Sequence, residues 1–153
     1  MQYWIFKTEP SEFSIEDLKS KGKSGEEWNG IRNFQARNFL RDKVKSGDQV
    51  LIYHSSCKEI GVVGLAEVIK EAFIDKLAFD SNSKYYDEKS DPEKPRWYSV
   101  QIRWVKTFDK TISLQQIKND NNLKETFLVK RSRLSVGEIN QKQFERFLKF
   151  NSL

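Results

Sequence analysis

The strand-forming segments of this chain are short, and no long helices separate them. Strand patterns occur at residues 3–7, 49–55, 61–72 and 98–104. In a doubly wound fold, parallel strands need crossover connections of a dozen or more residues, usually a helix. The order of segments therefore favours an α+β domain, in which a mixed, strongly curved sheet or a small barrel is flanked by short helices.

The helices that the sequence predicts are also short, and two of them begin at recognisable capping residues. Ser14 with Asp17 three residues on has the spacing of a capping box. Asn33 is a preferred cap for a helix over residues 33–43. Gly64, inside a strand pattern, indicates a bulge or a close approach of two backbones. Helices are also expected at 113–118 and 140–149, a final strand at 128–130, and core side chains at Phe34, Phe39 and Leu40.

The size and composition of the chain indicate one globular domain. Its 153 residues, taken as a single domain over 1–153, are enough to bury a core, and 11 Phe, 5 Tyr and 4 Trp compensate for a 37% hydrophobic fraction. No apolar run approaches the length of a membrane span, and the first residues lack a signal peptide's basic region and apolar core. We therefore expect no membrane partner and a cytoplasmic protein, or a cytoplasmic or nuclear one in a eukaryote.

The counts of cysteine and histidine limit the chemistry. A single cysteine, Cys57, excludes an internal disulfide, and a single histidine, His54, argues against a protein-built zinc site. His54 neighbours Ser55, Ser56 and Cys57, but no glycine-framed nucleophile elbow and no CxxC motif surrounds them. Residues 21–25 lack the spacing of a phosphate-binding P-loop. We expect no metal, no organic cofactor and no catalytic residue.

Positive charge is concentrated near the C-terminal end of the chain. The net charge is +5, and residues 124–149 alone carry seven basic and three acidic side chains, a balance of +4. Such clustering suits a polyanion, although a solvated helix face explains part of it. A nucleic acid is the partner that this distribution favours.

Residues 28–40 carry the most informative functional pattern. Trp28 is followed by a glycine turn, then by Arg32 and Asn33. A flat aromatic face beside an amide and a cation can hold a nucleobase, because every base has a π face to stack on and polar edges to read. The structural alternatives remain open: Trp28 as a core residue and Asn33 as a helix cap.

Four segments stand in order along the chain: residues 3–10, 28–36, 53–55 and 131–136. Together they resemble the EVE domain, a member of the PUA-like superfamily and a relative of the YTH domain. The loop 87–97 also resembles a loop of that family, and the resemblance covers nearly the whole chain. It implies a PUA-like mixed β-barrel flanked by short helices. It also implies binding of a modified nucleobase, since related domains hold a methylated adenine in RNA or a 5-substituted cytosine in DNA.

The resemblance and the residue types together predict a site. Trp28 would form an aromatic wall, with Tyr53 or Trp97 as a second face, and Tyr85 and Tyr86 of the long polar loop 81–95 would close over it. Polar edge contacts are expected from Asn33, His54, Ser55 and Ser56, and contacts at the rim from Lys7, Thr8 and Glu9. The candidates for phosphate contacts are Arg32, Arg37, Lys130, Arg131 and Arg133.

Two other kinds of function remain open from the sequence. A nucleic-acid-processing enzyme would use His54 or Glu9 and would show turnover. A small-molecule or protein-interaction module on the same fold would show no salt-dependent binding to nucleic acid. The single-domain length and the clustered basic residues argue against the second of these. The resemblance to the EVE domain favours a non-enzymatic reader of a modified base in DNA or RNA.

Overall fold

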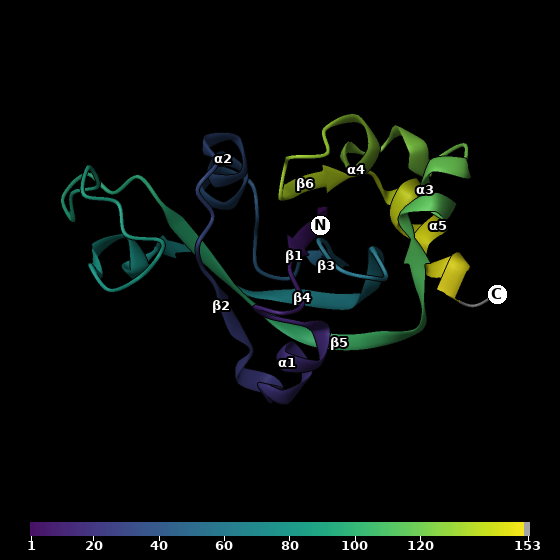
Figure 1. Ribbon diagram of the computed structural model, residues 1–153, viewed down its shortest axis with the longest axis horizontal. Coiled ribbons are helices and arrows are strands. Elements are labelled where there is room, and N and C mark those ends of the chain that lie inside the picture. The colour runs from purple at the N-terminus through teal and green to yellow at the C-terminus, as the bar shows by residue number, and fades with distance from the viewer. Residues whose placement is uncertain (152–153) are drawn as a thin grey trace.

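Figure 1 shows the computed structural model, which describes residues 1–151. A mixed six-stranded sheet runs in the order β2-β5-β4-β3-β1-β6. β1 pairs in parallel with β3, and the other four pairs of neighbouring strands are antiparallel. The strands are β1 (Tyr3–Thr8), β2 (Glu26–Trp28), β3 (Gln49–His54), β4 (Gly61–Ile74), β5 (Tyr98–Ser113) and β6 (Val136–Ile139).

The sheet is open in its hydrogen bonding. β2 and β6 are its edges, and no pairing joins them within residues 1–151. The α+β class and the curved mixed sheet are confirmed, whereas a closed barrel is not. In Figure 1, β5 bends along its length, which curls the sheet around the space above β3 and β4.

Short helices surround the sheet. α1 packs on β5, and α2 contacts β4, β5 and β6. Within residues 1–151, no helix is both long enough and apolar enough to span a membrane. The helices are α1 (Ile15–Ser20), α2 (Phe34–Asp42), α3 (Leu114–Asn119), α4 (Phe127–Lys130) and α5 (Gln141–Asn151), with 3₁₀ turns η1 (Gly22–Ser24), η2 (Lys76–Phe79) and η3 (Leu123–Glu125).

The predicted caps are confirmed. Ser14 Oγ accepts a hydrogen bond from the Asp17 amide, and the Asp17 carboxylate accepts one from the Ser14 amide, which completes the capping box. Asn33 caps α2 by accepting from the amide of Ala36 at 3.0 Å. The prediction that Phe34 is a core residue is wrong: its ring is 51% exposed, and Ala36 and Leu40 supply the buried face of α2 instead.

Two short strands are not predicted from the sequence, and one predicted strand is wrong. Residues 26–28 lie outside the predicted strands, yet they form β2 by pairing with β5. Residues 127–130 form helix α4 rather than a strand. The last strand is β6, where Gly137 lies so close to Phe127 that an added Cβ would come within 2.4 Å of its ring. These segments are too short for their own sequence pattern to determine their structure.

The core lies between the sheet and its helices. The central strands β1 and β3 bury continuous apolar runs, as expected for strands covered on both faces. Gly64 lies at a register shift between β4 and β5, and a Cβ there would come 2.5 Å from the Lys106 carbonyl oxygen. The predicted bulge and close approach are therefore both confirmed. From α5, the core receives the rings of Phe144 and Phe147.

Candidate nucleic-acid interface

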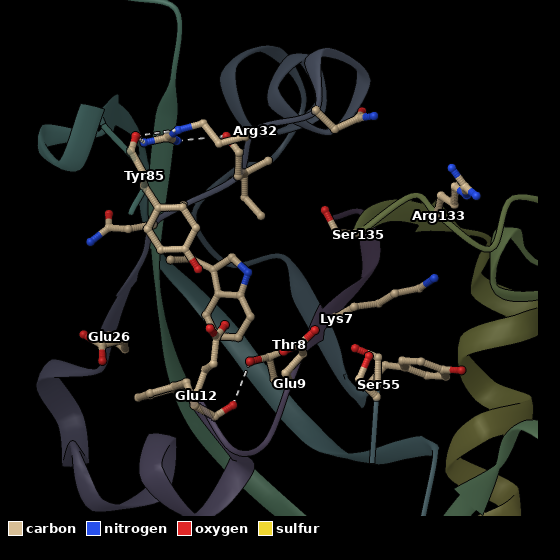
Figure 2. A pocket seen from close by; sticks show the side chains of 18 of the residues that line it. Lys7, Thr8, Glu9, Glu12, Glu26, Arg32, Ser55, Tyr85, Arg133 and Ser135 are labelled. Carbon is tan, nitrogen blue, oxygen red and sulfur yellow. Dashed lines mark hydrogen bonds between the residues drawn. The ribbon is translucent and has the colours of Figure 1, made fainter. Parts of the chain in front are cut away.

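A cavity of about 1100 Å³ is lined by residues from β1, β2 and β3. Its walls come from five segments that are far apart in the sequence. Figure 2 shows them from close by, with Tyr85 and Arg133 on opposite sides of the cavity. The volume is at the upper end of the range of small-molecule sites, so a planar base fits with space for the strand that carries it. The lining segments are residues 7–13, 26–33, 53–60, 84–85 and 128–135, joined by Leu77 and Leu114.

Trp28 lines this cavity from a fixed position. It ends β2, where it pairs with Val100 of β5, and its side chain is only 6% exposed. The indole packs 5.7 Å from the ring of Phe6 and edge-on to Phe13 at 6.0 Å. Trp28 is therefore both a core residue and a wall of the cavity, so the two interpretations of its role do not exclude each other.

Tyr85 supplies another aromatic ring to the cavity wall, in addition to Trp28. Its ring lies over Gly30, where φ is +84°, and a Cβ at Gly30 would be 2.7 Å from the ring. A residue larger than glycine at position 30 would both strain the backbone and displace the tyrosine. The polar loop expected to close over the site therefore does contribute a wall, through Tyr85, whereas Tyr86 does not line the cavity.

A buried carboxylate fixes the relative position of the Trp28 turn and the Tyr85 loop. The Asp75 side chain is completely buried and accepts hydrogen bonds from the Gly30 amide at 2.8 Å and from Arg32 Nη1 at 2.9 Å. Arg32 in turn donates twice to the Tyr85 carbonyl oxygen, at 3.0 and 2.8 Å (Figure 2). Asp75 and Arg32 thus hold two segments that are more than 40 residues apart.

This network corrects two predicted roles. The Arg32 guanidinium is occupied by Asp75, by Tyr85 and by the Ile31 carbonyl, so Arg32 positions the wall instead of being free to bind a phosphate. Trp97 does not line the cavity. Its ring stacks on Phe34 at 4.8 Å and its indole nitrogen donates to Asp87 at 2.7 Å. Trp97 therefore anchors the loop, and Tyr85 takes the place expected for it as second face.

The rim on the side of β1 and β3 combines cationic and hydroxyl groups. Lys7 Nζ donates to the Ser132 carbonyl oxygen at 2.8 Å and lies 5.4 Å from the ring centroid of Tyr53. Partial burial lowers the pKa of Lys7 and raises that of Tyr53. Predicted residues that the structure brings to the cavity here are Lys7, Thr8, Glu9, Tyr53, Ser55 and Ser56, with Asn33 on the facing side.

Apart from Glu9, the carboxylates at the cavity were not singled out from the sequence. Glu12, Glu26 and Glu27 all line it, and Glu12 forms an ion pair with Lys84 that joins the α1 side to the Tyr85 loop. In the sequence these glutamates lie in polar stretches without a motif, so only the fold brings them to the cavity. They add hydrogen-bond acceptors to a lining that otherwise consists mainly of aromatic rings, hydroxyl groups and cations such as Lys7 and Arg133.

A smaller basic cleft adjoins the cavity. It is lined by residues 130–134 together with Asn33 and Gln35. Asn33, Ser132 and Arg133 line both hollows. Lys130 pairs with Glu125 at 2.7 Å, whereas Arg131 and Arg133 are exposed and form no ion pair with any carboxylate of residues 1–151. Arg37 donates to the Arg96 carbonyl at 2.7 Å and lines neither hollow. Two of the candidate phosphate ligands are therefore free to bind.

The family model described as "EVE domain" matches residues 2–150. The chain belongs to the EVE domain family. It is 37% identical to human thymocyte nuclear protein 1 and 38% identical to the chicken protein of that name, in each case over 94% of the chain. It spans 71% and 66% of the lengths of these two relatives.

Solved structures agree with this assignment. A crystal structure of human THYN1 protein in complex with 5-methylcytosine-containing DNA matches with a TM-score of 0.94 and 35% identity, covering 100% of this chain and 99% of that chain. A protein from Pseudomonas syringae matches with a TM-score of 0.92 and 41% identity, over 97% of this chain and 99% of that one. The fold and cavity described above thus belong to an EVE domain.

His54 lies outside the cavity of this EVE domain. Its Nε2 accepts a hydrogen bond from the Ile15 amide at 3.1 Å, at the start of α1, and its side chain borders a different surface hollow beside Ile60 and Leu114. Burial lowers its pKa. The predicted edge contact from His54 is thus not supported by its position. The residue instead holds α1 against the end of β3.

This hydrogen bond predicts a pH dependence of stability. The bond needs neutral His54, and the unfolded chain takes up the proton near pH 6.5, above the lowered pKa of the folded state. The contribution of this hydrogen bond to the free energy of unfolding is therefore complete above about pH 6.5 and is lost as the pH falls below that value. The expected loss is about 1 kcal/mol for one hydrogen bond. Urea unfolding at pH 7.5 and 5.5 measures the loss. His54→Gln, which retains an acceptor, should show a smaller decrease, and an equal decrease would contradict this assignment.

Proposed function

We propose that this EVE domain is a non-enzymatic reader that binds a modified nucleobase, such as a 5-substituted cytosine or a methylated base, within DNA or RNA. The observation that carries the proposal is the cavity walled by Trp28 and Tyr85, which continues directly into a basic cleft. The complex of human THYN1 protein with 5-methylcytosine-containing DNA supports the same class of ligand. One domain, 1–153, would perform the whole task.

The cavity suits an extruded base. Stacking on an aromatic wall contributes about 1–3 kcal/mol per base, enough to offset the few kcal/mol that extrusion from a duplex costs. A buried methyl group adds only about 0.8 kcal/mol. Discrimination must therefore also come from polar groups that the wrong base leaves unpaired. Asn33, Ser55 and the cavity carboxylates are the groups placed for that role.

The carboxylates favour a base that carries an exocyclic amine. Glu and Asp side chains accept hydrogen bonds from cytosine N4, which thymine and uracil lack. Glu12, Glu26 and Glu27 supply such acceptors within the lining. Cytosine or adenine derivatives are therefore better partners for this cavity than derivatives of uracil or thymine.

A fluorescence-anisotropy titration at fixed, moderate salt tests the proposal. Matched DNA and RNA oligonucleotides would carry cytosine, 5-methylcytosine, 5-hydroxymethylcytosine, adenine or N6-methyladenine. We expect at least a tenfold preference for one modified base, equivalent to about 1.4 kcal/mol. Equal affinity for all of them would reject a base reader. Absence of salt-dependent binding would leave a small-molecule or protein-interaction module as the better description.

The basic cleft predicts a second, separable effect. The double variant Arg131→Gln/Arg133→Gln should weaken binding to every oligonucleotide and lower the slope of log K against log salt by about 1–2, because each phosphate contact releases counterions. The preference for a modified base should persist. The measurement is the same titration repeated at several salt concentrations.

A second double variant serves as the matched control, because it also removes two positive charges, but from a different part of the surface. Lys110→Gln/Lys118→Gln removes two exposed cations that line neither the cavity nor the basic cleft. Its salt slope should stay close to that of the unaltered protein. If both double variants lower the slope equally, net charge rather than the cleft governs binding.

A further inference from the structure

Phe34 is the most unusual side chain near the cavity. It is 51% exposed, whereas most large apolar residues of this chain are buried. It is the first residue of α2 and follows directly on Asn33, which lines both the cavity and the basic cleft. Gln35, on its other side in the sequence, also lines the basic cleft. Phe34 itself lines neither hollow, but both of its neighbours in the sequence line the basic cleft, so an exposed phenylalanine lies beside that cleft.

The ring of Phe34 is held in place from behind. It stacks on the buried Trp97 with centroids 4.8 Å apart and planes inclined by 22°. The guanidinium of Arg37 lies 4.8 Å from its centroid, and that of Arg32 lies 5.2 Å from the Trp97 ring. A ring fixed in this way loses little conformational freedom when it contacts a ligand, which makes it suited to binding.

We propose that Phe34 is a wedge that enters a duplex at the step from which the modified base is extruded, and stacks in the space left behind. The inference rests on the proposed function, because only a reader that extrudes a base leaves such a space. Apolar side chains inserted between base steps are a recurrent device of proteins that distort DNA.

The location of Phe34 supports this occupant over another protein. Asn33, the residue next to Phe34, lines both the cavity that would hold the extruded base and the cleft of the exposed Arg131 and Arg133, which suit its phosphates. Charge complementarity to a polyanion and continuity with the cavity both favour nucleic acid. An unpaired base opposite the extruded one offers the π face on which a phenyl ring can stack.

The wedge predicts an effect confined to double-stranded ligand. Phe34→Ala should weaken binding to a duplex that carries the preferred modified base by about tenfold, and binding to the same modified strand alone by less than twofold. A single strand has no base pair to open, so the wedge has no space to fill there. Phe34→Tyr keeps an aromatic ring and should bind the duplex within about threefold of the unaltered protein.

Tyr86→Ala serves as the matched control, since Tyr86 is a similarly exposed aromatic residue, at 46%, whose neighbours in the sequence do not line the basic cleft. It should leave both affinities unchanged. Equal losses on duplex and single strand for Phe34→Ala, or no loss on the duplex, would overturn the wedge. The proposed function fails separately, if the unaltered protein shows no preference for a modified base on the single strand. Thermal unfolding of each variant verifies that the fold is retained.

Discussion

Asp75→Ala is expected to lower the free energy of unfolding by about 3–5 kcal/mol, the usual cost of removing one partner from a buried ion pair. The change leaves Arg32 with an unpaired charge and the amides of Gly30 and Leu77 without their acceptor. For a chain of this length, the midpoint of thermal unfolding should fall by roughly 10 °C. Calorimetry or circular dichroism measures the shift.

A matched control separates this network from a general effect of losing a carboxylate. Asp109→Ala removes an exposed aspartate of β5, which is expected to change stability by no more than about 0.5 kcal/mol. Asp75→Asn should lie between the two, because the amide oxygen can still accept one of the hydrogen bonds. A loss for Asp75→Ala no larger than that for Asp109→Ala would show that Asp75 does not hold the two segments together.

Tyr85→Ala is expected to have the largest effect on ligand affinity with little effect on the fold. Removing one stacking wall should cost about 1–3 kcal/mol of binding, a loss of roughly five- to 150-fold. The ring lies over Gly30 in a loop held through its backbone carbonyl by Arg32, so the loop does not depend on the ring. Anisotropy titration with the preferred modified oligonucleotide measures the loss.

The neighbouring Tyr86→Ala is the control for this experiment too, because it changes the same loop without changing the cavity. Equal losses for the two variants would remove Tyr85 from the cavity wall. Trp28→Ala is a less selective test. The indole packs on Phe6 and Phe13, so its removal should also destabilise the core by about 3–5 kcal/mol, and weaker binding could then reflect unfolding.

Residues with a strong local signal were predicted well from the sequence. The apolar runs of β1 and β3, the caps at Ser14 and Asn33, and the bulge at Gly64 each follow from a rule that acts within a few residues. β2 could not be predicted in this way. Its three residues Glu26–Trp28 become a strand because β5 offers a free edge, and that partner is more than 70 residues away.

The candidate site divides in the same manner. Trp28, Tyr53 and the serines at the end of β3 lie at the cavity, as predicted from residue types and from the resemblance. Trp97 was predicted as a second aromatic face, but Tyr85 lines the cavity instead. Which side chain of this irregular segment faces the cavity could not be predicted, because periodicity gives no information in irregular backbone. Arg32 was predicted to bind a phosphate because its local sequence shows no partner for it. The partner, Asp75, lies 43 residues further on.

The position of β1 within the sheet has a consequence for synthesis on the ribosome. β1 lies between β3 and β6, so its second edge stays uncovered until residues 136–139 have been made. Until then, Trp4, Ile5 and Phe6 belong to an apolar strand with one unpaired edge, the kind of edge that associates with other chains. Among the six strands, β1 is therefore the one whose second partner, β6, is synthesised the largest number of residues later. Premature termination between β5 and β6 would release a chain that is prone to aggregate rather than a smaller reader.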